Sequence, residues 1–272
     1  MPKLLLLCFS LALLTGKTAA DEESTFNWQL GVGFGASHGR NLIPAFDSKQ
    51  NGLPQLQIHF DFEYKNWFAE TGSVRSGYVF GDPTLGYRLL KDDDYNVALT
   101  AASYHFGFGP TISSNDGLRL KSLEGLNNRT HDLLPGVRYQ QQLSENQLFS
   151  LQLSKDVIAH HGEILSLFYG HRFEYNNWDL YLNTELSWHS AKLVNYYYGV
   201  NALESRPERP QYHAGSGWRQ HYGLVGVYPL HTKWVMELGA GINWYSKAHT
   251  QSPLTRNKPE WQSFVIFRYV YK

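Results

Sequence analysis

The sequence predicts an all-β fold, an antiparallel transmembrane β-barrel of about twelve strands. Three observations point to it. Apolar and polar residues alternate over long stretches, aromatic residues stand at both ends of these stretches, and short turns alternate with longer loops. Aromatic residues make up 15% of the 272 residues, and no run after the N-terminus approaches the ~20 apolar residues that a transmembrane helix needs.

The N-terminus has the features of a secretory signal peptide. An apolar run over 4–14 is followed by small residues at 18–20 and then by an acidic segment. This order predicts a signal peptide over residues 1–20 and a barrel over residues 21–272. The single cysteine, Cys8, lies in the signal peptide, so we expect neither disulfides nor thiolate metal sites in the mature chain. The formal charge of zero offers no basic surplus for nucleic acid.

Two nearly identical hexapeptides predict hairpin turns. FEYKNW occupies 62–67 and FEYNNW occupies 173–178. Before the first one, 55–64 places apolar and aromatic residues on one face of a strand and polar residues on the other. After the second one, 178–188 alternates in the same way. Lys-Asn and Asn-Asn between such strands suit tight turns, because asparagine tolerates a positive φ.

Similar alternation predicts the remaining strands. It is clear near the mature N-terminus, before the second hexapeptide and in the last two strands, over 28–36, 165–175, 234–244 and 265–271. Weaker patterns surround Ala69, Leu85, Val97, Val137 and Leu151.

The connections between the predicted strands fall into two kinds. Five are short, near 65–66, 91–94, 144–146, 176–177 and 231–233. Six are longer, near 37–53, 76–83, 107–131, 158–162, 190–217 and 246–259. Because the two kinds alternate strictly, the number of strands is even and both termini lie on the short-turn side, which is the periplasmic side of an outer-membrane barrel.

Aromatic residues at both ends of the strands predict contact with a membrane. The strands over 178–188 and 234–244 carry tryptophans ten residues apart, and ten tilted residues climb roughly 25 Å, the height of an outer-membrane apolar band. A soluble β-sandwich would bury these faces against a second sheet and would not need aromatic residues at both rims. The predicted interfacial girdle consists of Tyr64, Trp67, Tyr175, Trp178, Trp188, Trp234 and Trp244.

Charged residues on the alternate faces would point into the barrel lumen. They form a predicted lumen charge network of Asp61, Glu63, Glu70, Arg88, Arg138, Arg172, Glu174, Glu185, Glu237 and Arg268. One interpretation is structural, since buried charges must compensate each other and so rigidify the interior. The other is functional, a pore constriction with a mild preference for cations. Large residues on the same faces, such as Tyr181, Phe168 and Tyr245, favour the structural interpretation.

No residue pattern predicts catalysis, a cofactor or a bound metal. His189 and Ser190 are neighbours, so a continued strand would turn them to opposite faces, which is poor geometry for a base and a nucleophile. His160 and His161 would diverge in the same way at a loop tip. We expect the 12 histidines to be scattered polar residues at the rims and in the loops rather than ligands. The segment 92–94, three aspartates, could attract calcium, but in a short turn it is more typical of a solvated cap.

Several stretches resemble the MipA/OmpV family, also called the MltA-interacting protein family, of Gram-negative outer-membrane proteins. The most specific stretch holds Tyr196, Tyr197, Tyr198 and Gly199, and it begins the loop over 190–217. Further similar stretches are Glu204-Ser205-Arg206-Pro207, Tyr212-His213-Ala214-Gly215-Ser216-Gly217, Gly86-Tyr87-Arg88-Leu89 and Ser252-Pro253-Leu254. The resemblance covers most of the mature chain.

The resemblance implies an outer-membrane location, in contact with lipid and lipopolysaccharide. It also implies a scaffold that links a lytic transglycosylase to a penicillin-binding protein. Two alternatives stay open, a small-solute channel and a surface adhesin that acts through its longer loops. For the loop over 190–217 we consider a solvated loop with aromatic anchors, a lid over the barrel mouth, and contacts from Arg206 and Arg209 to lipopolysaccharide phosphates.

Overall fold

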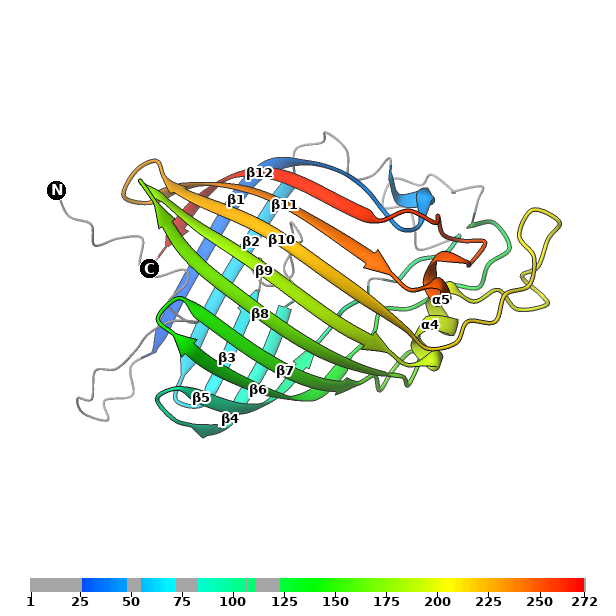
Figure 1. Ribbon diagram of the computed structural model, residues 1–272, viewed down its shortest axis with the longest axis horizontal. Helices are drawn as coiled ribbons and strands as arrows, with labels where there is room; N and C mark the ends of the chain where they lie inside the picture. The colour runs from blue at the N-terminus through cyan, green and yellow to red at the C-terminus, as the bar shows by residue number, and fades with distance from the viewer. Residues whose placement is uncertain (1–25, 48–54, 72–82, 106, 111–122, 272) are drawn as a thin grey trace.

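The computed structural model of the protein describes residues 26–47, 55–71, 83–105, 107–110 and 123–271, so the predicted signal peptide lies outside them. Within these residues, twelve strands form one closed antiparallel barrel (Figure 1). The fold class is therefore confirmed. The strands are β1 Asn27–Arg40, β2 Gln55–Tyr64, β3 Trp67–Thr71, β4 Pro83–Lys91, β5 Tyr95–Ala102, β6 Leu134–Ser144, β7 Gln147–Lys155, β8 Glu163–Tyr175, β9 Trp178–His189, β10 Gly217–Pro229, β11 Trp234–Tyr245 and β12 Glu260–Tyr271.

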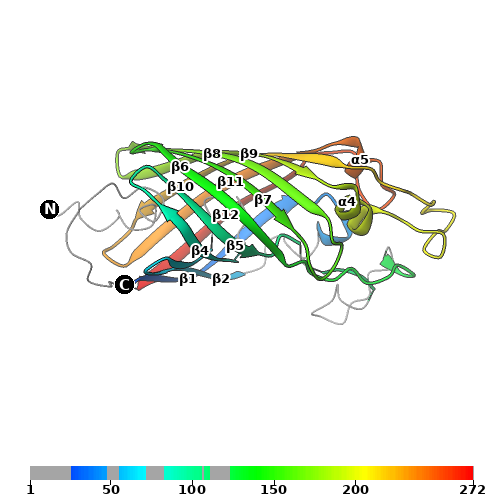
Figure 2. The same cartoon turned by 90° about the horizontal axis from the view of Figure 1, so that it is seen from below.

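The barrel closes where its first strand meets its last. β1 pairs with β12 over Leu30–Arg40, with Leu30 opposite Tyr271 and Arg40 opposite Trp261. Every other strand pairs with its neighbours in sequence. The short turns lie at one end of the barrel, the turn end, and the helices lie at the other, the loop end (Figure 2).

The side-chain alternation of the strands turns the apolar face outward. On β9, Leu182 and Leu186 are exposed, whereas Asn183 and Ser187 are buried on the inner face. The same outward exposure holds for Ile58 on β2 and for many apolar residues around the barrel, including Leu56, Leu85, Leu99, Leu153, Leu167, Leu224 and Leu238. A belt of exposed apolar side chains around a closed sheet is what lipid-facing strands require.

The two hexapeptides form matching hairpin turns. Tyr64 stands opposite Trp67 across the first turn, and Tyr175 stands opposite Trp178 across the second. In the second turn Asn176 adopts the expected positive φ of 53°. In the first turn Lys65 has a φ of 54°, so the left-handed position falls on the first turn residue in both hairpins, whatever its type.

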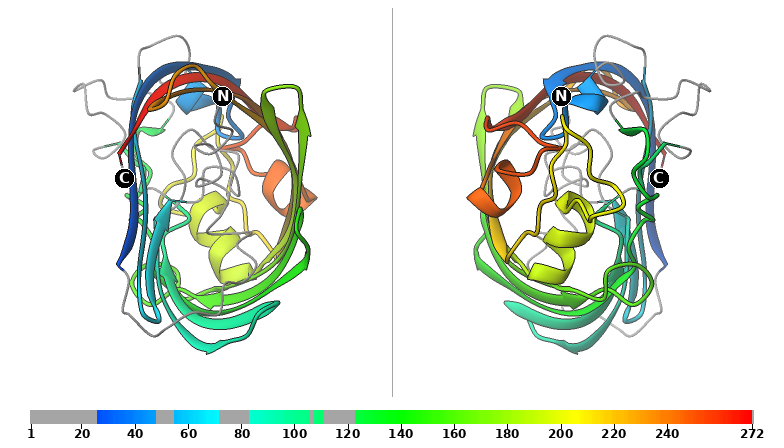
Figure 3. Two further views of the ribbon diagram at one scale, coloured as in Figure 1. Left: turned by 90° about the vertical axis from the view of Figure 1, so that its left-hand side faces the viewer. Right: turned by 90° about the vertical axis from the view of Figure 1, so that its right-hand side faces the viewer.

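The loop end carries structure that the β pattern does not predict. The segment over 190–217, expected to be a loop, contains the helix α4, Ala191–Tyr198, and a second short helix α5, Lys247–Thr250, follows β11. A 3-10 turn covers Pro44–Phe46. Seen along the barrel, α4 lies inside the outline of the strands (Figure 3). None of the helices in the described part of the chain is long and apolar enough to cross a bilayer.

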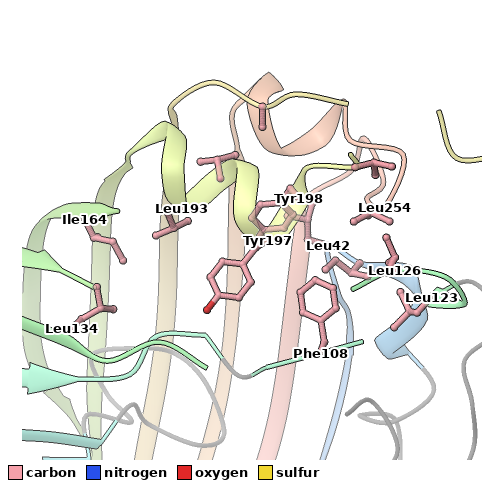
Figure 4. Packing of buried hydrophobic residues seen from close by; sticks show 14 residues of the cluster. Leu42, Phe108, Leu123, Leu126, Leu134, Ile164, Leu193, Tyr197, Tyr198 and Leu254 are labelled. Carbon is pink, nitrogen blue, oxygen red and sulfur yellow. The ribbon is translucent and has the colours of Figure 1, made fainter. Parts of the chain in front are cut away.

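The larger of two buried apolar clusters fills the mouth of the barrel at the loop end (Figure 4). Its residues come from four separate loops and from the ends of β6 and β8: Leu42, Ile43, Phe108, Leu123, Leu126, Leu134, Ile164, Leu193, Val194, Tyr197, Tyr198, Val200, Ala214 and Leu254. We call the described loop residues over 41–46, 103–133, 190–216 and 246–259 the cap. The cap is a packed core of its own, set across one end of the barrel.

Candidate functional site

The inner wall of the barrel holds arginines that each contact a carboxylate. The distance from Arg138 Nη1 to Glu70 Oε1 is 2.6 Å, and that from Arg172 Nη2 to Asp179 Oδ1 is also 2.6 Å. Three further pairs are Arg88 with Glu63, Arg219 with Glu185, and Arg268 with Glu237. Buried charges need such compensation, because an isolated charge in a low-dielectric interior is costly.

Eight of the ten residues of the predicted lumen network belong to these pairs: Glu63, Glu70, Arg88, Arg138, Arg172, Glu185, Glu237 and Arg268. Asp61 is partly buried and stands opposite Glu70 in the β2–β3 register. Glu174 lies beside the turn end and is exposed, although its carboxylate accepts a 2.9 Å hydrogen bond from Arg172.

Two members of the pairs, Arg219 and Asp179, are absent from the predicted network. Arg219 stands on β10 between the outward Trp218 and Gln220, so the period-two pattern of that strand places it inside. The predicted loop over 190–217 ends just before Arg219, so the strand that begins there was not recognised from the sequence. Asp179 lies on the inward face of β9 next to the turn end.

Large inner side chains lie over glycines of the neighbouring strand. The ring of Phe68 on β3 has the guanidinium of Arg88 at 4.8 Å and that of Arg138 at 4.9 Å from its centroid. A Cβ atom on Gly86 would collide with this ring, and one on Gly239 would collide with the ring of Phe264. Glycine at these positions lets the rings lie against the barrel wall.

A buried ion pair clamps the cap. Arg129 donates from Nη1 to Glu204 Oε1 over 2.8 Å and from Nη2 to Glu204 Oε2 over 3.1 Å. Burial alone would raise the pKa of Glu204, but hydrogen bonds from Arg129 and from two backbone N–H groups lower it. The buried guanidinium of Arg209 donates to the backbone oxygens of Glu204 and Glu124. Arg209 thus holds the cap together and does not point outward to lipopolysaccharide.

The tyrosine–glycine motif forms the end of α4 and its exit. Tyr197 is buried and its hydroxyl donates to the backbone oxygen of Thr130, while the Tyr196 hydroxyl accepts from the Thr130 N–H. Tyr198 is buried against His249, with ring centroids 5.1 Å apart. A Cβ at Gly199 would collide with the backbone oxygen of Asn195, so a close approach requires glycine here. Of the three possibilities considered for this loop, α4 forms a lid over the mouth, whereas most of residues 201–213 is exposed and extends away from the barrel (Figure 1).

Four histidines converge below α4, contrary to the expected scatter. His105 Nδ1 lies 2.9 Å from Asp132 Oδ2, and His160 Nε2 lies 3.7 Å from the same oxygen. The His105 ring stacks on Tyr197 at 4.3 Å between centroids. Burial raises the pKa of Asp132, but hydrogen bonds from His105 and the nearby ring of His160 hold it well below its usual range. Residues far apart in sequence meet here, which a strand pattern cannot reveal.

The other two histidines join the cap to the wall. Nδ1 of His189, at the end of β9, lies 3.1 Å from Nε2 of His249 on α5. Ser190 is buried and its Oγ accepts the N–H of Glu163, so it does not pair with His189. In the part of the chain that the structure describes, no three histidine, cysteine or acidic side chains are arranged to hold a metal ion.

The aromatic residues of the predicted girdle lie on the outer surface near the two ends of the barrel. At the turn end, Trp67 packs edge-on against Tyr87 and Trp234 against Tyr269, at 4.9 and 5.3 Å between centroids. Trp178 packs against Tyr228, and Tyr64 and Tyr175 are exposed beside their turns. At the loop end, Trp188 and Trp244 are exposed. Their role at the membrane interface stays a prediction.

The chain is similar to several known proteins. The family model described as MltA-interacting protein MipA matches residues 27–271. The outer membrane protein Omp26La of Vibrio anguillarum is 23% identical over 72% of this chain and 82% of its own. The outer membrane protein OmpV of Vibrio cholerae has the same identity and coverage. The NanC porin structure has a TM-score of 0.47 at 10% identity, covering 88% of this chain and 98% of that one.

These relatives are named as outer membrane proteins, and the closed barrel with its apolar outer belt fits that location. The turn end is then periplasmic and the loop end extracellular. The chain belongs to the MltA-interacting protein MipA family.

Proposed function

We propose that this protein is a capped outer-membrane barrel that docks a periplasmic lytic transglycosylase. The observation that carries the proposal is the cap, whose buried side chains from four loops pack across the extracellular mouth. A packed mouth does not suit a permanently open pore. The description of the family names an interaction with MltA, a lytic transglycosylase.

The docking surface available to such a partner is the periplasmic rim. Its turns are short, and the most strongly charged is 92–94, three consecutive aspartates that follow β4. This turn touches the neighbouring hairpin, since the Asp94 backbone oxygen accepts the N–H of Gln142. A partner docked on such a rim contacts several turns at once, because no single turn offers enough surface. A penicillin-binding protein would then join through the transglycosylase or through the same rim.

A binding experiment tests the docking function. The detergent-solubilised barrel is immobilised and incubated with a purified MltA-type lytic transglycosylase, and the retained enzyme is quantified. We expect retention by the wild type and loss of retention when Asp92, Asp93 and Asp94 are all replaced by asparagine. The matched control removes charge at the opposite end, by Glu208→Gln in the exposed loop, and should retain the enzyme. Absence of retention by the folded wild type would contradict the proposal.

A gated small-solute channel is the second candidate, favoured by the polar inner wall below the cap. Buried polar residues line that wall, among them Gln57, Gln140, Gln152, Asn183 and Ser187. A polar lining is typical of barrels that hold water. Single-channel recording in planar bilayers separates the candidates, because a barrel with a fixed cap shows no conductance steps under any condition.

A further inference from the structure

The His189–His249 hydrogen bond is one of several direct contacts between the barrel wall and the cap, which also include Ser246 with Trp218 and Ser190 with Glu163. His189 ends β9, and His249 belongs to α5, which lies at the loop end of the barrel (Figure 1). His189 is 3% exposed and His249 is 0% exposed, so neither ring reaches water. A Cβ atom on Gly217, at the start of β10, would come within 2.5 Å of the His249 ring. The two rings are therefore buried and closely packed against their neighbours.

Among the described residues, no carboxylate is in direct contact with either ring of the pair. In the described residues, the recorded contacts of the two rings are with each other, with Ser246 Oγ and with aromatic rings. The titratable and charged groups that face the pair are His105 and His160 from the loops, Arg219 from β10, Tyr198 from α4, Tyr245 from β11 and Lys247 on α5 itself. Three acidic residues lie one step further away: Asp132 contacts His105 and His160, Glu185 pairs with Arg219, and Glu260 accepts from the Tyr245 hydroxyl.

The neighbouring histidines offer a contrast within the same cluster. His105 and His160 both lie next to the buried carboxylate of Asp132. A proton added to either of them meets a negative charge. A proton added to each ring of the His189–His249 pair instead creates two positive charges about one hydrogen-bond length apart, near the guanidinium of Arg219.

Proton uptake must therefore favour the open cap. In the closed cap, burial and the charges of His105 and Arg219 lower the pKa of His249 to about 3. A histidine released into water titrates near pH ~6.5. Between these two pKa values, His249 is protonated in the open state and neutral in the closed state. The ratio of open to closed cap therefore rises about ten-fold for each pH unit of acidification.

We propose that the His189–His249 pair is a proton-operated latch, which holds the cap closed while both rings are neutral and releases it on acidification. Release frees α5 from the end of β9 and exposes the polar lumen below. The latch acts at the extracellular mouth, so it does not depend on partner docking at the periplasmic rim. If either the latch or the docking proposal fails, the other is unaffected.

Cysteine accessibility measures the release, because Cys8 is the single cysteine and lies in the predicted signal peptide. Val194 on α4 is 0% exposed, whereas Leu203 in the following loop is 94% exposed. The variants Val194→Cys and Leu203→Cys are labelled in parallel with a membrane-impermeant thiol reagent, and the ratio of their rates cancels the pH dependence of the reagent. We expect this ratio to rise at least ten-fold between pH 7.5 and pH 5, following the linkage above. An unchanged ratio would overturn the proposal.

A second set of variants assigns the effect to the pair. The side chains introduced by His249→Gln and His249→Phe cannot take up a proton. The variant in which Val194→Cys is protected from thiol labelling at pH 7.5 should also protect it at pH 5. The matched control His231→Gln alters an exposed histidine in a periplasmic turn and should respond to acid like the wild type. A His249 variant that is closed at pH 7.5 and still opens with acid overturns the proposal. Conductance steps that appear only at acidic pH, and not in that variant, would support it further.

Discussion

In the barrel wall each strand pairs with its neighbour in sequence, whereas the cap joins residues far apart in the chain. Across the first hairpin, Tyr64 faces Trp67. In the cap, Arg129 meets Glu204 across 75 positions and His189 meets His249 across 60. The wall is secured by a continuous ladder of backbone hydrogen bonds, whereas the cap is held by its buried apolar cluster and by scattered backbone and side-chain hydrogen bonds. The cap can therefore open as a separate unit while the barrel stays closed.

The largest expected effect comes from the wall. Arg268→Ala leaves the carboxylate of Glu237 buried without its cation, since their side chains are 0% and 4% exposed. We expect a loss of about 3–5 kcal/mol in the free energy of unfolding, measured by urea denaturation in lipid vesicles. The control Lys155→Ala breaks an exposed pair with Glu163 and should cost less than about 1 kcal/mol. Equal effects of the two variants would refute a wall stabilised by buried pairs.

The next effect should be confined to the cap. Arg129→Ala removes both hydrogen bonds to the Glu204 carboxylate, which destabilises the closed cap by about 2–3 kcal/mol. Labelling of Val194→Cys at neutral pH should then increase by roughly a hundred-fold, with the urea midpoint of the barrel unchanged. If barrel and cap unfold together in this variant, they are one cooperative unit and the comparison fails.

A smaller effect tests the packing of rings over glycines in the wall. Gly86→Ala places a methyl group against the Phe68 ring, and such overpacking costs about 1–3 kcal/mol. In the cap, Gly215 has no atom within 4 Å of its hypothetical Cβ, so Gly215→Ala should change stability by less than about 0.5 kcal/mol. Urea denaturation of both variants decides whether the wall is the more tightly fitted region.

The smallest effect is an acid dependence of the loop between β7 and β8. Burial raises the pKa of Asp156, but backbone N–H groups of His161, Leu133 and Ala159 donate to its carboxylate and lower the pKa to about 2. This stabilisation is present above pH ~3.8 and is lost as the pH falls towards 2, which amounts to about 1–2 kcal/mol. Asp156→Asn should abolish this part of the pH dependence in unfolding measured between pH 5 and pH 2. An unaltered pH profile would exclude the carboxylate as its source.

Much of the wall is predictable because its pattern is local. Period-two alternation gives the strand number, the alternation of turns and loops, and the inward position of Arg138 and Glu237 from neighbouring residues alone. The inward position of Arg219 was equally predictable from the alternation in β10, and it was missed because of the boundary chosen for the preceding loop. Which charged residues pair with each other is harder to predict from the sequence. Pairing across strands depends on the register of the strands as well as on the face to which each side chain points.

A signal peptide, a single cysteine, outward apolar faces, an even set of strands and a family resemblance could all be predicted from the sequence, because each of these predictions uses residues close together in the chain. The signal peptide stays a prediction. The three-dimensional structure was needed to show that residues 191–198 form a helix at the mouth, that Arg209 is buried, and that four histidines meet beside α4. Those contacts join loops separated by dozens of residues, and no local pattern records which distant side chains the closing of the barrel brings within reach.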